Sequence, residues 1–281
     1  MSCDKAAFDH YYVIKMWKAI NLRPFFLSPI MDNGYSGIFI NPDPCGLLCF
    51  LFVYFVIFYS DYAFIYWIII DSEFDLLKTL NICCYQIAFS LLIWSHLKAS
   101  LTNPGHVLRS DPNDDSAFEN LLKSNKEFNL RVCKKCKAYR PPKSYHCRIC
   151  QKCIYKMHHH CPWINNCVGQ VNQKFFIQFL FYLLLICVYT IVVIIIELIS
   201  NRNTSQAKAI HTFILLIESL LFGIFAIVVF SDQVYSVIKS TPSSKSLSPQ
   251  LFITKLCGTE KWLLWILPFK QDDQNYKQLV V

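Results

Sequence analysis

Charged residues are scarce in this chain of 281 residues: Asp, Glu, Lys and Arg together make up only 16%. An average soluble domain has about a quarter. Glycine is also scarce, with 7 residues, and no collagen-like period is present. Hydrophobic residues account for 54%, which excludes a disordered chain. The chain therefore has too little polar sequence to cover its apolar residues in water.

Most of the apolar residues lie in four long segments, at about 46–70, 79–97, 175–196 and 210–230. Each reaches the ~20 residues with which an α-helix crosses ~30 Å of hydrocarbon. The alternative, four core helices of a soluble protein, would need polar sequence that is lacking. The sequence therefore predicts an all-α multi-pass membrane protein with four transmembrane helices. The expected parts are an N-terminal segment 1–45, helices 1 and 2 in 46–97, a cysteine-rich domain 98–174, helices 3 and 4 in 175–230, and a C-terminal tail 231–281.

The distribution of charge predicts which segments face the cytosol. Segment 98–174 holds 14 Lys or Arg against 5 Asp or Glu, whereas the loop between the first two helices is acidic. The positive-inside rule places segment 98–174 and both termini in the cytosol, and the sequon at Asn203 in the lumen. Because the first 41 residues lack the apolar core of a cleavable signal peptide, the first helix is expected to anchor the chain in the endoplasmic reticulum or Golgi.

Two features of the apolar segments leave alternatives open. Asp61 and Glu218 are ionisable groups at membrane depth, and they either turn into the bundle for structural reasons, which is preferred, or form a relay. Residues 262–269 contain Trp262 and Trp265 but are too short to span a membrane. They either lie in the cytosolic interface or pack as a small apolar patch against the loop.

Seven of the 14 cysteines lie between Cys133 and Cys167, interleaved with histidines. In the reducing cytosol these cysteines are not a disulfide framework. Repeated C-x2-C pairs with nearby histidines are typical of zinc sites, and inert buried cysteines are the less favoured alternative. Two closed Cys3His sites would use six cysteines and two histidines, which leaves one cysteine over. A cysteine beside a histidine-rich run is a candidate nucleophile, although spacing alone does not identify it.

The basic residues of this domain have more than one possible partner. The spacing lacks the C2H2 pattern of a DNA-binding finger, so no nucleic-acid partner is expected. Anionic lipid headgroups or the phosphates of coenzyme A fit the charges better, and a merely solvated surface is the alternative. The residues concerned are Lys134, Lys135, Lys137, Arg140, Lys143, Arg148, Lys152 and Lys156.

One stretch, residues 133–176, matches a known family closely. It contains Arg140-Pro141-Pro142-Lys143-Ser144-x-His146-Cys147, then His158-His159-His160-Cys161-Pro162-Trp163-Ile164-Asn165-Asn166-Cys167-Val168-Gly169, then Asn172 and Phe176. This stretch resembles the DHHC family of protein S-acyltransferases, or palmitoyltransferases. Thr102-Asn103-Pro104-Gly105 is similar to the family's Asp-Pro-Gly motif, with Asn in place of Asp.

The resemblance implies two structural Zn²⁺ ions and a cysteine nucleophile. One ion would be bound by Cys133, Cys136, His146 and Cys153, and the other by Cys147, Cys150, His160 and Cys167. Cys161 would be the nucleophile and His159 its base. The implied reaction moves a long-chain (palmitoyl) group from acyl-CoA, through acyl-Cys161, to protein substrates with cysteines near the cytosolic face of the membrane.

The sequence departs from the family at two places. His158 stands where the motif has Asp, and the family's Thr-Thr-x-Glu-like motif is poorly matched by Ser240-Thr241-Pro242-Ser243. Neutral His158 forms hydrogen bonds but supplies no negative charge to the base, so a slower enzyme is expected. The alternative is a catalytically impaired scaffold that binds clients or a partner acyltransferase. A small transporter is a third possibility, weakly supported by Asp61 and Glu218.

Overall fold

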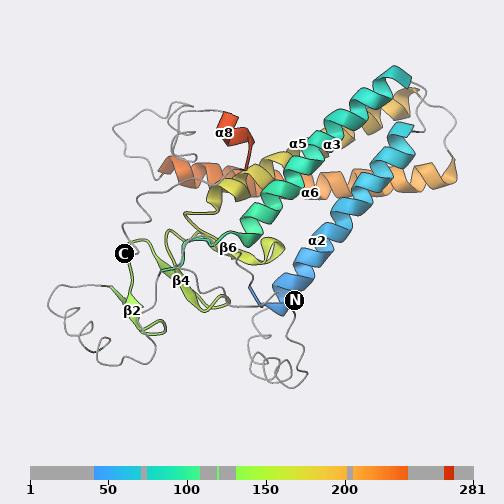
Figure 1. The fold of residues 1–281 in the computed structure, drawn as a ribbon. Helices are drawn as coiled ribbons and strands as arrows, with labels where there is room; N and C mark the ends of the chain where they lie inside the picture. The colour runs from blue at the N-terminus through green and yellow to red at the C-terminus, as the bar shows by residue number, and fades with distance from the viewer. Residues whose placement is uncertain are drawn as a thin grey trace.

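The computed structural model describes residues 41–70, 75–107, 119, 131–200, 205–239 and 263–268. Four long helices make up most of these residues (Figure 1): α2 (Pro44–Ala63), which η2 (Phe64–Ile70) continues as a π-helix, α3 (Asp75–Leu101), α5 (Gln173–Ser200) and α6 (Gln206–Lys239). Residues 1–40, the sequon at Asn203 and residues 240–243 lie outside the described residues. The predictions for those segments are therefore not addressed by the fold.

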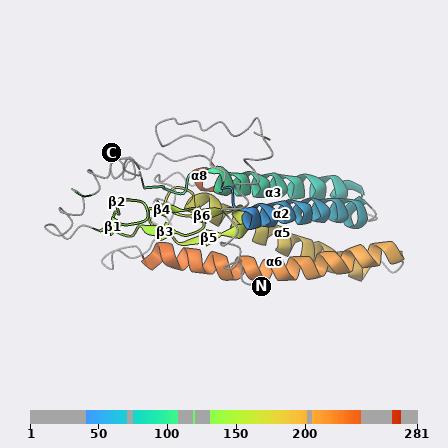
Figure 2. The same ribbon diagram turned by 90° about the horizontal axis from the view of Figure 1, so that it is seen from below.

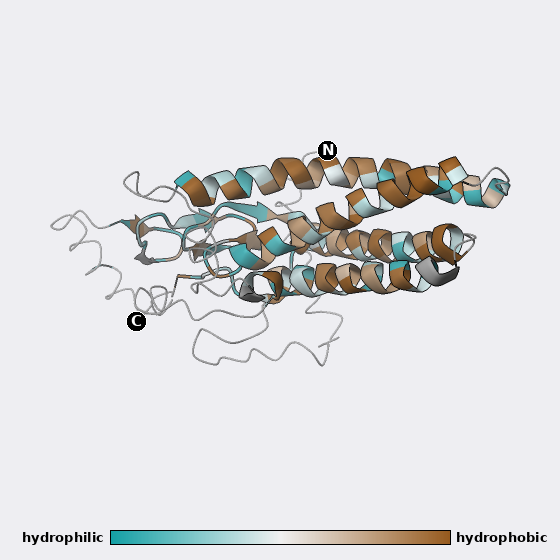
Figure 3. Cartoon of the chain, turned by 90° about the horizontal axis from the view of Figure 1, so that it is seen from above, coloured by the Kyte–Doolittle hydropathy of each residue, from teal (hydrophilic) through white to brown (hydrophobic). Residues whose placement is uncertain are grey.

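All four helices are long and apolar enough to cross a membrane. Hydrophobic residues occur along most of the length of these helices (Figure 3), and Leu48 and Phe55 on α2 are 69% and 70% exposed. A helix that is apolar all round is suited to lipid, because its backbone groups are satisfied internally. The predicted four-helix membrane fold is confirmed. α6 extends to Lys239, however, beyond position 230, where the sequence placed the end of the fourth helix.

Three small β-hairpins lie at one end of the helix bundle, where α2 and α5 begin and α3 and α6 end (Figure 2). Each hairpin is an antiparallel pair of strands. The pairs are β1 (Val132–Cys133) with β2 (Ala138–Tyr139), β3 (Tyr145–Cys147) with β4 (Lys152–Ile154), and β5 (His159–Cys161) with β6 (Asn166–Val168). A short 3-10 helix, η3 (Pro162–Ile164), joins β5 to β6. This cysteine-rich region lies between the second and third membrane helices, as predicted.

Two buried asparagines attach the cysteine-rich region to the end of α3. The Asn166 side-chain amide donates to the carbonyl oxygens of Ser100 and Thr102, both at 2.9 Å. The Asn172 amide donates to the carbonyl of Ala99 at 3.0 Å and to that of Cys167 at 2.8 Å. The last carbonyls of a helix have no partner within the helix. These asparagines bond to such carbonyls and fix the β5–β6 hairpin against the end of α3.

The Asn-Pro-Gly segment after α3 forms a second attachment. The Asn103 side-chain oxygen accepts hydrogen bonds from the N–H groups of Gly105 and His106, both at 2.9 Å. An Asp side chain could accept the same two hydrogen bonds, so Asn can take the place of Asp in this turn. Gly169 approaches this turn so closely that an added Cβ would lie 2.3 Å from the Pro104 carbonyl oxygen. A glycine is therefore required at position 169.

The ionisable groups at membrane depth are paired between helices. The Gln86 amide of α3 donates to Asp61 of α2 at 2.6 Å, and Ser60 of α2 donates to Glu218 of α6. Both carboxyl groups therefore have the structural partners that the sequence interpretation preferred. Within the apolar segment near the C-terminus, α8 (Leu263–Ile266) packs on α5, with the Trp265 ring edge-on to Phe181 at 5.0 Å between centroids. Among the described residues, α8 thus packs against a membrane helix.

Candidate functional site

The first cluster of potential metal ligands combines a turn with a cross-strand pair. Cys133 ends β1 and Cys136 lies in the turn that follows, and His146 lies opposite Cys153 in the β3–β4 hairpin. The His146 Nδ1 atom is 3.6 Å from Cys133 Sγ, 3.2 Å from Cys136 Sγ and 3.9 Å from Cys153 Sγ. All four ligand atoms lie within 4.8 Å of one another. Such a Cys3His group has the composition and spacing of a tetrahedral zinc site.

The second cluster repeats the same construction with other elements. Cys147 ends β3 and Cys150 lies in the β3–β4 turn, and His160 lies opposite Cys167 in the β5–β6 hairpin. The His160 Nδ1 atom is 3.8, 3.4 and 3.6 Å from the sulfur atoms of Cys147, Cys150 and Cys167. The structure thus brings together both sets of four residues that the resemblance implied. Within the described part of the chain, these eight residues fit two zinc ions bound through three sulfurs and one Nδ1 each.

Strand alternation separates the metal cluster from the candidate nucleophile. Successive side chains of a strand point to opposite faces, so His160 faces the second cluster while His159 and Cys161 share the other face of β5. Cys161 is only 4% exposed. Burial raises the pKa of its thiol to about 11, although the N–H groups of Ile164 and Trp163 hydrogen-bond to the sulfur and oppose this effect. The thiol is therefore protonated at neutral pH and needs a base.

His159 has the surroundings of a neutral base. Its ring packs edge-on to Phe176, with centroids 5.6 Å apart. Burial lowers the pKa of the imidazole, the charges of neighbouring His158 and His160 lower it further, and the carboxylate of Asp232 on α6 acts in the opposite direction. A neutral imidazole accepts a proton, which is what a thiol with a raised pKa requires.

His158 contacts α6. Its Nδ1 atom is 3.2 Å from Ser236 Oγ, and its backbone N–H donates to the Val168 carbonyl at 2.9 Å. Burial lowers the pKa of this imidazole, while a hydrogen bond with the Gln173 side chain and the charge of Asp232 favour the protonated form. His158, which stands where the family motif has Asp, is therefore surrounded by polar groups of α5 and α6.

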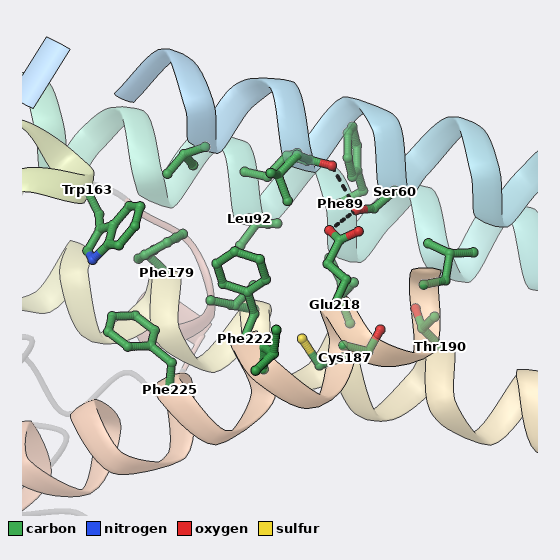
Figure 4. A pocket seen from close by; sticks show the side chains of 18 of the residues that line it. Ser60, Phe89, Leu92, Trp163, Phe179, Cys187, Thr190, Glu218, Phe222 and Phe225 are labelled. Carbon is green, nitrogen blue, oxygen red and sulfur yellow. Dashed lines mark hydrogen bonds between the residues drawn. The ribbon is translucent and has the colours of Figure 1, made fainter. Parts of the chain in front are cut away.

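An apolar cavity of about 280 Å³ runs from Cys161 into the helix bundle. Figure 4 shows its length: Trp163 lies at one end, and Ser60 and Glu218 lie well along it, near Cys187 and Thr190. All four membrane helices contribute to the lining, which is largely Phe, Leu, Ile and Val. Such a cavity suits an extended hydrocarbon chain whose reactive end lies at the sulfur of Cys161.

Ser60, Asp232 and Ser236 had no individual mark in the sequence, whereas Glu218 was already notable as an ionisable group at membrane depth. Asp232 and Ser236 lie about 75 positions after His158, and Ser60 and Glu218 belong to different membrane helices. The one available signal was the spacing of Asp232 and Ser236, which places two polar side chains on one face of α6. That pattern indicates a polar face but does not say what the face contacts.

Comparison with known proteins agrees with this geometry. The family model described as DHHC palmitoyltransferase matches residues 126–248. The chain is 30% identical to palmitoyltransferase ZDHHC3 of Homo sapiens, over 92% of this chain and 94% of that protein. It is 29% identical to palmitoyltransferase ZDHHC7 of Mus musculus, over 81% of this chain and 79% of that protein. The chain belongs to the DHHC palmitoyltransferase family.

Proposed function

We propose that this protein is a membrane-bound protein S-acyltransferase that transfers palmitoyl or a similar long-chain group from acyl-CoA to cysteines of protein substrates. The observation that carries the proposal is the position of Cys161, which lines an apolar cavity formed by all four membrane helices. A buried thiol at the mouth of a hydrocarbon-sized cavity is suited to hold a thioester with its acyl tail in the membrane. Family membership supports the same reaction class.

In the first step, His159 takes the proton of the Cys161 thiol, and the thiolate attacks the thioester carbonyl of acyl-CoA. The bond between the carbonyl carbon and the CoA sulfur breaks, and the CoA sulfur takes the proton back from His159, so that CoA leaves as a thiol. The products are acyl-Cys161 and free CoA. The N–H groups of Trp163 and Ile164, which hydrogen-bond to the Cys161 sulfur, favour the thiolate during this step.

In the second step, a cysteine of the protein substrate attacks the acyl-Cys161 carbonyl. Its acyl-sulfur bond forms while the Cys161–acyl bond breaks, so Cys161 leaves as a thiolate and is ready for another cycle. His159 again accepts the incoming proton. Because the reacting thioester lies near the membrane surface, substrates with cysteines close to the bilayer are favoured over cysteines in distant domains.

The rest of the cytosolic region holds this chemistry in place. Zinc ions bound at the two Cys3His clusters would contribute folding energy, because the ligands converge only in the folded region. Exposed Lys134, Lys135 and Lys143 provide positive charge for the phosphates of CoA or for lipid headgroups. The same proposal divides the chain into functional parts after residues 45, 97, 174 and 230. It places the protein in the membrane of the endoplasmic reticulum or Golgi, with both termini in the cytosol.

Self-acylation is the test of this function. Purified protein incubated with labelled palmitoyl-CoA should acquire label that hydroxylamine removes, as expected of a thioester. Cys161→Ser should abolish this label, and His159→Ala should strongly slow it. Cys83→Ser, which alters an exposed cysteine on α3, should label as the wild type does. Wild-type protein without label at Cys161, but with normal zinc content, would contradict the proposal.

A second candidate function is a non-catalytic scaffold of the same family. The observation that favours it is His158, which replaces the acid expected beside the base. Such a protein would keep both metal clusters and bind clients or a partner acyltransferase without forming acyl-Cys161. The self-acylation experiment separates the two functions, because only the enzyme acquires thioester label.

A further inference from the structure

The cytosolic end of α6 carries a group of polar side chains that faces the candidate active site. Ser236 Oγ lies 3.2 Å from His158 Nδ1, and both side chains are partly buried. Gln233, which is fully buried, accepts a hydrogen bond from the Gln173 amide at 3.4 Å and donates one to Asp232 at 3.3 Å. The end of α6 therefore meets the first residue of α5 and the start of β5 through polar contacts (Figure 2).

Buried polar groups in an apolar helix are costly unless they are paired. Here the partners are provided by His158 and Gln173 and not by lipid-facing neighbours. The Ser236–His158 contact joins residues 78 positions apart in the chain. One of its two members, His158, stands where the family motif has its acid.

We infer that Ser236 is a positioning residue of the acyltransferase site: its hydroxyl fixes the ring of His158, so that α6 supports the position at which the motif's acid is replaced. This inference rests on the proposed function. Engagement of Nδ1 fixes the ring orientation and the hydrogen-bonding role of the other nitrogen, since the two nitrogens of a neutral imidazole differ in that role. His158 adjoins His159, so the orientation of His158 influences the position of the base.

The expected consequence is a change in the rate of reaction and not in folding. Small displacements of catalytic groups reduce rate strongly, even when binding is unaffected. Ser236 is not one of the eight potential metal ligands. Loss of its hydroxyl should therefore leave both clusters intact, leave the affinity for acyl-CoA unchanged, and slow the formation of acyl-Cys161.

The test compares Ser236→Val with Ser236→Thr, which have nearly the same shape and differ in the hydroxyl. The rate of Cys161 labelling is measured over a range of palmitoyl-CoA concentrations, together with zinc content. Ser236→Val should lower the maximal rate about three- to tenfold, the range for one lost hydrogen bond, with the half-saturating concentration unchanged. Ser236→Thr should keep the wild-type rate. Ser231→Ala, at an exposed serine of the same helix, is the matched control and should have no effect.

A double-mutant comparison identifies the partner. In a His158→Ala background, Ser236→Val should cause no further loss, because the contact is already absent. Equal rates for Ser236→Val and Ser236→Thr, undiminished loss in the His158→Ala background, or loss of zinc in Ser236→Val would each overturn the inference while leaving labelled wild-type protein and the proposed function intact. Absence of label from the wild type would instead overturn the proposed function, and this inference with it.

Discussion

Adjacent side chains along β5 point to opposite faces of the strand and therefore have different roles. His160 points to the second metal cluster and lies opposite Cys167 in the hairpin. Cys161 and His159 share the other face, where the sulfur meets the apolar cavity. A shift of one residue in strand register would exchange the two faces. The hairpin hydrogen bonds and the Asn166 and Asn172 contacts that fix this register are thus as important to the site as the reactive groups.

The negative charge near the base comes from a different element than the family motif would suggest. His158 supplies none, but the carboxylate of Asp232 on α6 acts on both His158 and His159. Asp232 is exposed, so solvent screens its effect. Its contribution should therefore be smaller than that of an acid within the motif itself. This arrangement is compatible with the slower enzyme expected from the sequence.

Substitution of the motif histidine tests this interpretation. His158→Asp should raise the self-acylation rate about two- to tenfold, because a carboxylate beside His159 stabilises the imidazolium that forms when Cys161 loses its proton. Asp232→Asn should lower the wild-type rate about two- to threefold, a smaller change because the charge is exposed. In the His158→Asp background, Asp232→Asn should have less effect, since the nearer charge dominates.

Labelling rates at saturating palmitoyl-CoA measure these differences, with zinc content as the control for folding. A His158→Asp protein slower than the wild type would mean that His158 has a catalytic role of its own. An Asp232→Asn protein with the wild-type rate would show that the α6 carboxylate does not contribute.

At the scale of elements, the β3–β4 hairpin connects the two metal clusters. His146 and Cys153 belong to the first cluster, whereas Cys147 and Cys150 belong to the second. The two ligands of the second cluster lie between those of the first along this short hairpin, so neither cluster is an independent unit. Coordination energy at either cluster is folding energy for the shared hairpin. Loss of a ligand from one cluster should therefore also weaken metal binding at the other.

Metal content provides the corresponding prediction. Cys133→Ala and Cys150→Ala should each lose at least one zinc ion per chain and lower the yield of folded protein, because each removes a ligand from a closed site. Elemental analysis of the purified variants measures the loss. Cys83→Ala, at an exposed cysteine on α3, should retain the wild-type zinc content. Normal metal content in both ligand variants would contradict the assignment of these clusters as zinc sites.

The cavity predicts a dependence on acyl-chain length. Ser60 lines the cavity away from the Trp163 end, so Ser60→Leu should shorten the space available to the tail. A methylene that no longer fits costs about 1–3 kcal/mol, so the ratio of 18-carbon to 14-carbon acyl transfer should fall about tenfold or more. Ser90→Leu places the same side chain at an exposed position of α3 and should leave the ratio unchanged. An unaltered ratio in Ser60→Leu would mean that the tail does not occupy this cavity.

For the whole molecule, composition was sufficient to predict the four membrane helices, since apolar length and scarce charge determine what can cross a bilayer. Spacing predicted a metal-binding region, and the family resemblance grouped its residues as the structure does. The contacts between distant elements could not be predicted from the sequence. Ser236 with His158, and Ser60 with Glu218, join residues whose faces meet only after the helices pack. The extension of α6 to Lys239 was missed because Ser231, Asp232 and Gln233 end the apolar run without ending the helix.

The orientation of the whole molecule in the membrane is the remaining prediction. The basic segment 98–174 should face the cytosol, because positively charged loops are retained on that side. A protease added to sealed microsomes should therefore cut within this segment, and only disrupted microsomes should expose the loop that contains Asn203. Glycosylation should be possible at Asn203 and be lost in Asn203→Gln. Leu122→Ser creates a second sequon at Asn120, within the basic segment, and this site should stay unmodified. A glycan at Asn120, or protection of segment 98–174 from the protease, would reverse the topology and place Cys161 on the side of the membrane that lacks cytosolic acyl-CoA.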